Sequence, residues 1–181
     1  MARRTVDRKA AALGSRLGAG VWMTRRLGKG RAMEVSGVAH VFITAGDFDR
    51  ATAFYRQLLP FLGLRPVMDA AGTYYCVGGR TGFGVRAPPP KHGGERFDQS
   101  RPGLHHVCFR ARAREDVDEA FAFLRSIGAT IVHDPKDDDW APGYYSVLFE
   151  DPDGVRLEIN HVPGQGLLTP GGSGHLGGNW S

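Results

Sequence analysis

The sequence predicts an α+β fold in which two βαβββ modules form a curled mixed sheet around a cleft. Segments 37–59 and 103–125 align without gaps at an offset of 66 residues, so the chain contains an internal repeat. In both copies, a run typical of a buried strand is followed by apolar residues at helical spacing. One module alone would leave a face of its sheet uncovered, so the two sheets are expected to share a cleft.

The first copy begins with a strand and continues into a helix for which Asp47 is the expected N-cap. Pro60 should end or kink this helix near its last turn, because proline removes a helical hydrogen bond. Gly63 is then the candidate for the residue just beyond the helix end. Three shorter strands are expected after it, at 64–68, 73–79 and 82–88.

The second copy repeats this order of elements. Its first strand leads into a helix whose apolar stripe ends at Ile127, and Gly128 is the candidate for the residue beyond it. The turn "DPDG" at 151–154 sets the register of the last strand. The strands that follow the helix are expected at 129–134, 143–151 and 155–162.

The composition divides the chain into a folded domain and two flanking segments. Residues 1–33 carry nine Lys or Arg and one acid, a net charge of +8, while the rest of the chain carries −4. We interpret this basic segment as an upstream extension before Met33 or a disordered leader, with an organellar transit peptide as the alternative. The Gly-rich end is expected to be disordered. The expected boundaries are a leader at 1–35, a domain at 36–163 (module one 36–88, linker 89–102, module two 103–163) and a tail at 164–181.

Charge and hydropathy argue against nucleic-acid and membrane partners. The net charge of +4 comes from the leader, and the folded body shows no basic patch with interleaved aromatic residues. No stretch approaches the ~18–20 apolar residues that a membrane span needs. Cys76 and Cys108 are isolated, which fits a reducing cytoplasm and no disulfide framework.

Three side chains are candidates for a metal site. The repeat places His40 and His106 at the same position of the two copies, so both are expected to project into the shared cleft. His105 should then point to the opposite face. Glu158 is a carboxylate within an apolar run, and burial of such a group is costly unless it is paired or coordinated. Two imidazoles and one carboxylate with open positions suit Fe, Mn and related divalent metals. The alternative is that these residues belong to the core or the surface, with Glu158 on an exposed polar face.

Further positions indicate how many ligands the metal would have and which side chains could transfer protons. Gly84 aligns with Glu158, so the first copy supplies no fourth ligand and leaves room for water or a bidentate oxygen ligand. One tyrosine from each of the pairs at 74–75 and 144–145 is expected to line the cleft. We take Tyr75 and Tyr145 as the candidates for moving protons, with the acids at 137–139 as alternatives.

The segments "HVFI", "HHVCF" and "FEDPDGVRLEI" resemble the vicinal oxygen chelate superfamily, over residues 37–162. That superfamily includes glyoxalase I, fosfomycin-resistance proteins, bleomycin-binding proteins and type I extradiol dioxygenases. The resemblance implies paired βαβββ modules around a cleft in which a metal chelates two neighbouring oxygens of a substrate. It also places the metal ligands at His40, His106 and Glu158. The pattern is most similar to uncharacterised bacterial glyoxalase-like members.

This chain differs at several positions from the residue patterns of individual families in the superfamily, and these differences limit which reactions are expected. Glyoxalase I usually supplies a further Glu near the end of its first module, where this chain has Gly84. Extradiol dioxygenases share the His–His–Glu pattern, but they have a tyrosine where this chain has Leu148. They also have a histidine where this chain has Asp-Trp-Ala at 139–141. True ring cleavage is therefore disfavoured. Fosfomycin-resistance proteins share the three ligands, but their phosphonate-binding residues are not recognisable in this chain.

The sequence therefore predicts an enzyme that uses a divalent metal (Fe, Mn, Ni or Zn) as a Lewis acid on a small oxygen-rich molecule held by two oxygens. One alternative is a non-catalytic protein of the same fold that sequesters a toxic or aromatic compound by stacking. A second alternative is a metal-free scaffold. Such modules pair within one chain or between two chains, so a homodimer is a further expectation. The sequence leaves the substrate, the metal and the reaction open.

Overall fold

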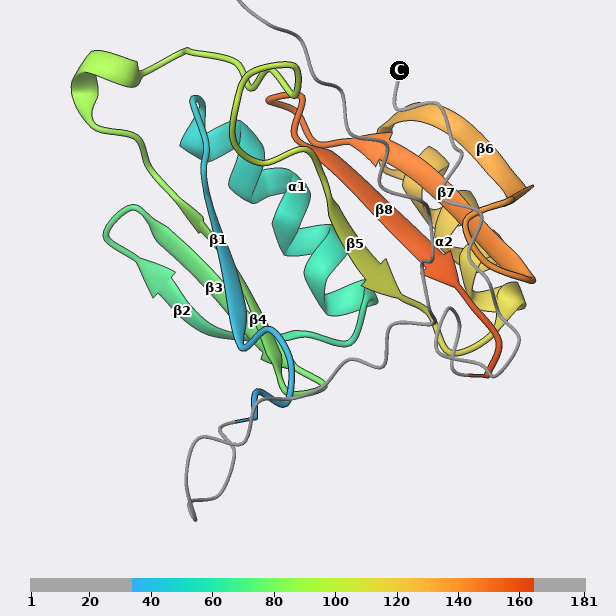
Figure 1. Ribbon diagram of the computed structural model, residues 1–181. Helices are drawn as coiled ribbons and strands as arrows, with labels where there is room; N and C mark the ends of the chain where they lie inside the picture. The colour runs from blue at the N-terminus through green and yellow to red at the C-terminus, as the bar shows by residue number, and fades with distance from the viewer. Residues whose placement is uncertain (1–33, 165–181) are drawn as a thin grey trace, which may run out of the picture. The chain divides into compact units, whose positions relative to one another are not determined.

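The computed structural model describes residues 34–164 and shows two βαβββ units in succession (Figure 1). Module one consists of β1 (His40–Thr44), α1 (Phe48–Phe61), β2 (Arg65–Ala70), β3 (Thr73–Gly78) and β4 (Thr81–Arg86). The connection contains one short 3-10 helix, η1 (Pro90–His92). Module two consists of β5 (Val107–Arg110), α2 (Arg114–Ser126), β6 (Thr130–Asp138), β7 (Tyr144–Glu150) and β8 (Arg156–His161). The predicted order of elements is confirmed, and the leader and tail expected at the two ends lie almost entirely outside the described residues.

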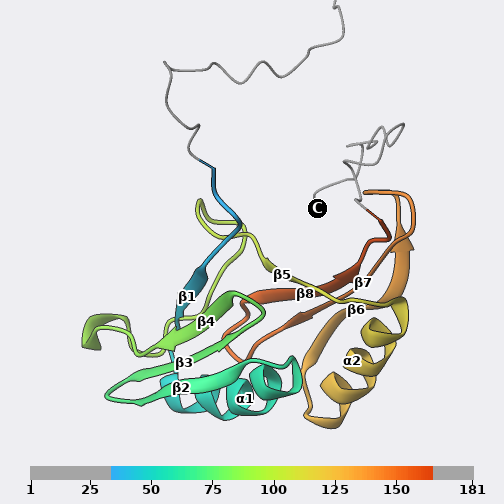
Figure 2. The ribbon, with the colours of Figure 1, turned by 90° about the horizontal axis from the view of Figure 1, so that it is seen from below.

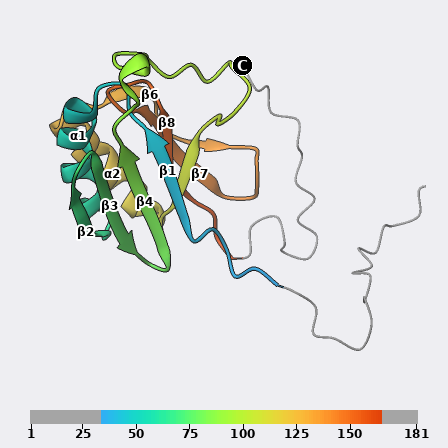
Figure 3. The ribbon, with the colours of Figure 1, turned by 90° about the vertical axis from the view of Figure 1, so that its left-hand side faces the viewer.

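Each module forms its own four-stranded mixed sheet, in the orders β1-β4-β3-β2 (Figure 3) and β5-β8-β7-β6. The first and last strands of each module run parallel, and the other pairs are antiparallel. Phe42 pairs with Gly84, and Cys108 pairs with Glu158, so Gly84 and Glu158 occupy equivalent positions in the two sheets. The two mixed sheets are separate and do not close on each other. In the described chain, β1 and β5 therefore each keep one edge without a neighbouring strand.

Local sequence signals set the ends of the helices. The Asp47 side chain accepts a hydrogen bond from the Arg50 backbone N–H at 3.0 Å, as predicted for an N-cap. α1 ends one residue after Pro60, and Gly63 follows with a φ of +80°. Glycine adopts this left-handed conformation without steric cost, so it suits the position after a helix end. None of the described helices is long and apolar enough to cross a membrane.

A shared hydrophobic core joins the two modules. α1 and α2 each cover one face of their own sheet, and both lie below the sheets in Figure 2. Phe61 of α1 stacks on Phe123 of α2 with ring centroids 3.9 Å apart, and the rings of Phe83 and Phe109 lie 5.6 Å apart across β4 and β5. Such aromatic pairs add to the stabilisation that their burial gives. The opposite face of each sheet, which we call the open face, carries no helix from residues 34–164.

The turn between β7 and β8 joins the modules by hydrogen bonds. Asp151 is 2% exposed, and its Oδ1 accepts the backbone N–H groups of Asp153 and Val155 at 2.9 and 2.8 Å. Its Oδ2 accepts the hydroxyl of Tyr55, from α1, at 2.8 Å. Asp153 accepts a hydrogen bond from the Arg50 guanidinium at 2.9 Å. One turn therefore sets the register of β8 and also holds the helix of the other module.

Replacement of Tyr55 by phenylalanine tests this connection. Tyr55→Phe should lower the free energy of unfolding by about 1–3 kcal/mol, because the buried Asp151 carboxylate loses one of its three donors. Urea denaturation followed by circular dichroism measures the change. Tyr75→Phe is the matched control, since Tyr75 is half-buried and its hydroxyl makes no hydrogen bond with the described residues. Equal effects of the two substitutions would show that the contact with Asp151 contributes no stability of its own.

Candidate metal-binding site

Glu158 is a buried carboxylate on the open face of module two. Its neighbours on β8, Leu157 and Ile159, point into the core and are 0% and 2% exposed. Because side chains alternate along a strand, Glu158 lies on the other face. It is only 8% exposed there. A charged group buried to this degree needs polar partners.

His106 and Tyr144 are the main partners of the Glu158 carboxylate. The His106 Nε2 atom lies 3.3 Å from Glu158 Oε2, and the Tyr144 hydroxyl donates a hydrogen bond to Oε1. Ser146, on the same face of β7 as Tyr144, also hydrogen-bonds the carboxylate. Side chains from β7 and from the residue before β5 therefore surround one buried anion on β8.

The charge state of Glu158 follows from this environment. Burial works to raise the pKa of its carboxyl, but the hydrogen bonds from His106 and Tyr144 lower it by more, so the pKa lies below the ordinary value of 4.5. Glu158 is therefore an anion at neutral pH, the form that can coordinate a metal. Burial and the hydrogen bond to Glu158 raise the pKa of Tyr144, so its hydroxyl keeps its proton at neutral pH.

His105 and His106 contact each other and do not lie on opposite faces. Their Nδ1 atoms are 2.7 Å apart, and their ring planes cross at 77°. The predicted alternation fails because both residues precede β5, which begins at Val107. One of the two Nδ1 atoms must donate and the other accept, so His105 influences which nitrogen of His106 carries a proton. Outer partners of metal-binding histidines orient their rings in this way.

His40 does not join this group within one chain. It lies exposed at the start of β1, and its ring contacts the ring of Phe42 edge-on, with centroids 5.6 Å apart. Across residues 34–164, no three His, Cys, Asp or Glu side chains are arranged to hold a metal ion. His40 and His106 were expected to project into one cleft of the same chain, and this arrangement is not seen. His40 begins β1 of one sheet, and His106 directly precedes β5 of the other.

The open face of module one carries aromatic rings at the place where module two carries Glu158. Gly84 occupies the equivalent position, and a Cβ atom there would collide with the ring of Phe42. A Cβ atom at Gly82 would likewise collide with the ring of Tyr75. The two rings stack with centroids 5.1 Å apart, and Phe42 is 43% exposed. Two glycines of β4 thus allow an exposed aromatic pair to lie against the sheet.

The two tyrosines expected to move protons both lie away from Glu158. Tyr75 belongs to the aromatic face of module one. Tyr145 points to α2, where its hydroxyl donates a hydrogen bond to Asp118 at 2.6 Å. Tyr144 is the tyrosine beside the carboxylate, and its position could have been predicted from the sequence. Pairing of β7 with β8 outward from the "DPDG" turn puts residues 144 and 146 on the face of Glu158.

Removal of the Tyr144 hydroxyl should raise the pKa of Glu158. In Tyr144→Phe the carboxylate loses a donor that favours its charged form, and its burial remains. A lowered carboxyl pKa gives stability that is lost as the pH falls through the folded-state value, so this loss should begin at a higher pH in the variant. Carbon NMR titration of the metal-free protein measures the pKa, with Glu158→Gln to assign the signal and Tyr75→Phe as the control. An unchanged or lower pKa would contradict this account of the site.

Comparisons with known proteins agree with the architecture described above. The family model for the Glyoxalase/Bleomycin resistance protein/Dioxygenase superfamily matches residues 37–159. The glyoxylase/bleomycin resistance protein/dioxygenase domain from Frankia sp. EAN1pec is 25% identical with a TM-score of 0.58, and the match covers 71% of this chain and 98% of that one. Lactoylglutathione lyase from Agrobacterium tumefaciens is 27% identical with a TM-score of 0.54, covering 71% of this chain and 96% of that one. The search of curated proteins found no significant match. Because the family model spans more than half of the sequence, the chain belongs to the Glyoxalase/Bleomycin resistance protein/Dioxygenase superfamily.

Proposed function

We propose that this protein is a divalent-metal-dependent enzyme that acts on a small oxygen-rich molecule held at the metal by two oxygens. The observation that carries the proposal is the 3.3 Å contact between His106 Nε2 and the buried Glu158 carboxylate. An imidazole nitrogen and a carboxylate oxygen are donors for which Fe, Mn, Ni and Zn compete well. Two donors bonded to one such ion at about 2.1 Å lie about 3 Å apart when the bonds meet near a right angle, so the pair fits a metal.

A metal bound by these residues would act as a Lewis acid on a carbonyl or enolate oxygen. Within this chain, His105 orients the His106 ring, and Glu158 supplies the negative charge. Tyr144 holds its proton beside Glu158 and is the group we assign to proton transfer with the substrate. We place the enzyme in the cytoplasm, because both cysteines, one of them buried, are free thiols.

The third ligand in this proposal is His40 from a second copy of the chain. The repeat gives His40 the position in module one that His106 has in module two, but the two do not meet within one chain. A homodimer in which module one of each copy faces module two of the other would supply the missing imidazole. The edges of β1 and β5, which have no neighbouring strand in the described chain, are available for such a pairing.

The alternative function is non-catalytic binding of an aromatic compound, and one observation favours it. Phe42 and Tyr75 form an exposed stacked pair above two glycines, a flat surface suited to a planar ligand. The description of the Agrobacterium tumefaciens relative as a lactoylglutathione lyase supports an enzyme instead. A binder would return the added compound unchanged, whereas an enzyme would consume it.

Metal content tests the assigned ligands directly. Protein purified without a chelator should hold one divalent metal per chain, measured by plasma mass spectrometry. Glu158→Gln and His106→Ala should lose this metal, because each removes a donor. His105→Ala should keep a site with about 10- to 100-fold weaker affinity, as expected when an outer hydrogen-bond partner is removed.

The matched control is His92→Ala, since His92 is exposed and pairs with Glu95 in the connection between the modules. It should retain the metal content of the unmodified protein. Equal metal content in His106→Ala and His92→Ala would remove His106 from the ligand set.

Mixing of two inactive variants tests whether the site is shared. His40→Ala and His106→Ala homodimers should each lack metal, since each lacks one imidazole at both sites. In a mixed dimer, the first chain offers His106 with Glu158 and the second offers His40, which restores one complete site. Random exchange of subunits should therefore recover about one quarter of the metal content of the unmodified protein. No recovery after exchange, verified by native mass spectrometry, would place all the ligands in one chain.

A further inference from the structure

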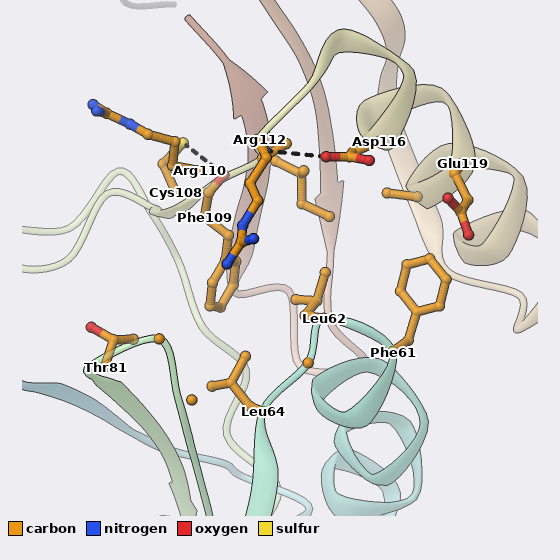
Figure 4. A pocket seen from close by; sticks show the side chains of 16 residues that line it. Phe61, Leu62, Leu64, Thr81, Cys108, Phe109, Arg110, Arg112, Asp116 and Glu119 are labelled. Atoms are coloured by element: carbon orange, nitrogen blue, oxygen red, sulfur yellow. Dashed lines mark hydrogen bonds between the residues drawn. The ribbon is translucent and has the colours of Figure 1, made fainter. Parts of the chain in front are cut away.

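A groove of about 680 Å³ lies between the two modules (Figure 4). It runs from the end of α1 and the turn between β3 and β4 to β5 and the start of α2. Neither Glu158 nor His106 lines it. Its volume falls within the range of about 300–1,000 Å³ that is typical of small-molecule pockets.

The floor of this groove is apolar. Leu62 and Leu64 reach it from the segment that follows α1, and Phe109 reaches it from β5 (Figure 4). Phe61 lines the part of the groove near α2, and its ring is held by stacking on Phe123 at 3.9 Å. A floor that is already ordered reduces the entropic cost of binding an apolar group.

Arg112 brings a positive charge to this apolar surface. Its side chain extends from the connection between β5 and α2 towards Phe109 and Leu62 (Figure 4). Its guanidinium makes no hydrogen bond or ion pair with the residues that the structure describes. Asp116 also lines the groove, but its carboxylate accepts the backbone N–H groups of Arg112 and Ala113 at 3.2 and 2.9 Å. The guanidinium is therefore available to an anion from outside the chain.

We propose that this groove binds an amphipathic monoanion, a small molecule with an apolar body and one carboxylate, sulfonate or phosphodiester group. The apolar body would cover Leu62, Leu64 and Phe109, and the anionic group would take the donors of Arg112, whose planar fork matches two oxygens. Glu119 lines the groove beside Phe61, and its negative charge disfavours a second anionic group at that end (Figure 4). The proposal does not depend on the metal site.

Titration of the full chain with 8-anilinonaphthalene-1-sulfonate tests the proposal. This probe has an apolar ring system and one sulfonate, and it fluoresces when it leaves water. Arg112→Gln should weaken its binding by about tenfold or more, because a charge-assisted hydrogen bond is lost. Arg86→Gln is the matched control, since Arg86 is exposed at the end of β4 and does not line the groove, and it should leave the affinity unchanged. Glu119→Gln should bind the probe at least as tightly as the unmodified protein.

Two further measurements separate the groove from other surfaces. Phe42→Ala removes the aromatic pair of module one, and the loss of affinity caused by Arg112→Gln should be the same with and without this substitution. If Phe42→Ala abolishes binding and Arg112→Gln does not, the proposal is wrong. Octanoate should displace the probe from the unmodified protein more effectively than octan-1-ol does, and equal displacement would also overturn the proposal without any variant. Chelator-treated protein should bind the probe as before, so failure of the metal site and failure of the groove are distinguishable.

Discussion

The arrangement of the two modules depends on the buried carboxylate of Asp151. Two backbone N–H groups of its own turn and the Tyr55 hydroxyl of the other module converge on its two oxygens. Burial raises the pKa of Asp151 above its ordinary value of 3.8, although these three hydrogen bonds lower it. The Asp151 carboxylate is thus buried although its burial destabilises the charged form. The Asp151 carboxylate sets both the register of β8, which carries Glu158, and the position of α1.

The two modules share a backbone plan and differ in the chemistry of their open faces. Module two presents a buried carboxylate with an imidazole and a phenol, whereas module one presents an aromatic pair over glycines. The strand pairing is the same at the position that distinguishes them, Gly84 in one module and Glu158 in the other. Two modules with the same backbone arrangement can therefore carry different chemical groups on their open faces. Polar donors and aromatic surface are divided between the halves of one chain.

Local patterns predicted the elements of the fold because strands, helices and caps are encoded by neighbouring residues. Asp47 caps α1, and the repeat register aligns Gly84 with Glu158, as the sequence indicated. The site was predicted less completely. His105 escaped the alternation rule because it precedes the strand, and the placement of His40 depends on how two sheets lie relative to each other, which no local pattern encodes. Tyr144 could have been predicted, because pairing β7 with β8 outward from the turn at 151–154 places it on the face of Glu158.

The glycine at position 84 has a consequence for how this chain can change over evolution. A glutamate introduced there would meet the ring of Phe42, which would have to rotate away and lose its stacking on Tyr75. A carboxylate in module one would therefore require coordinated changes at several positions, and the intermediates would lose packing before they gained a ligand. The packing of Phe42 against Gly84 therefore makes the difference between the two open faces costly to remove by a single substitution.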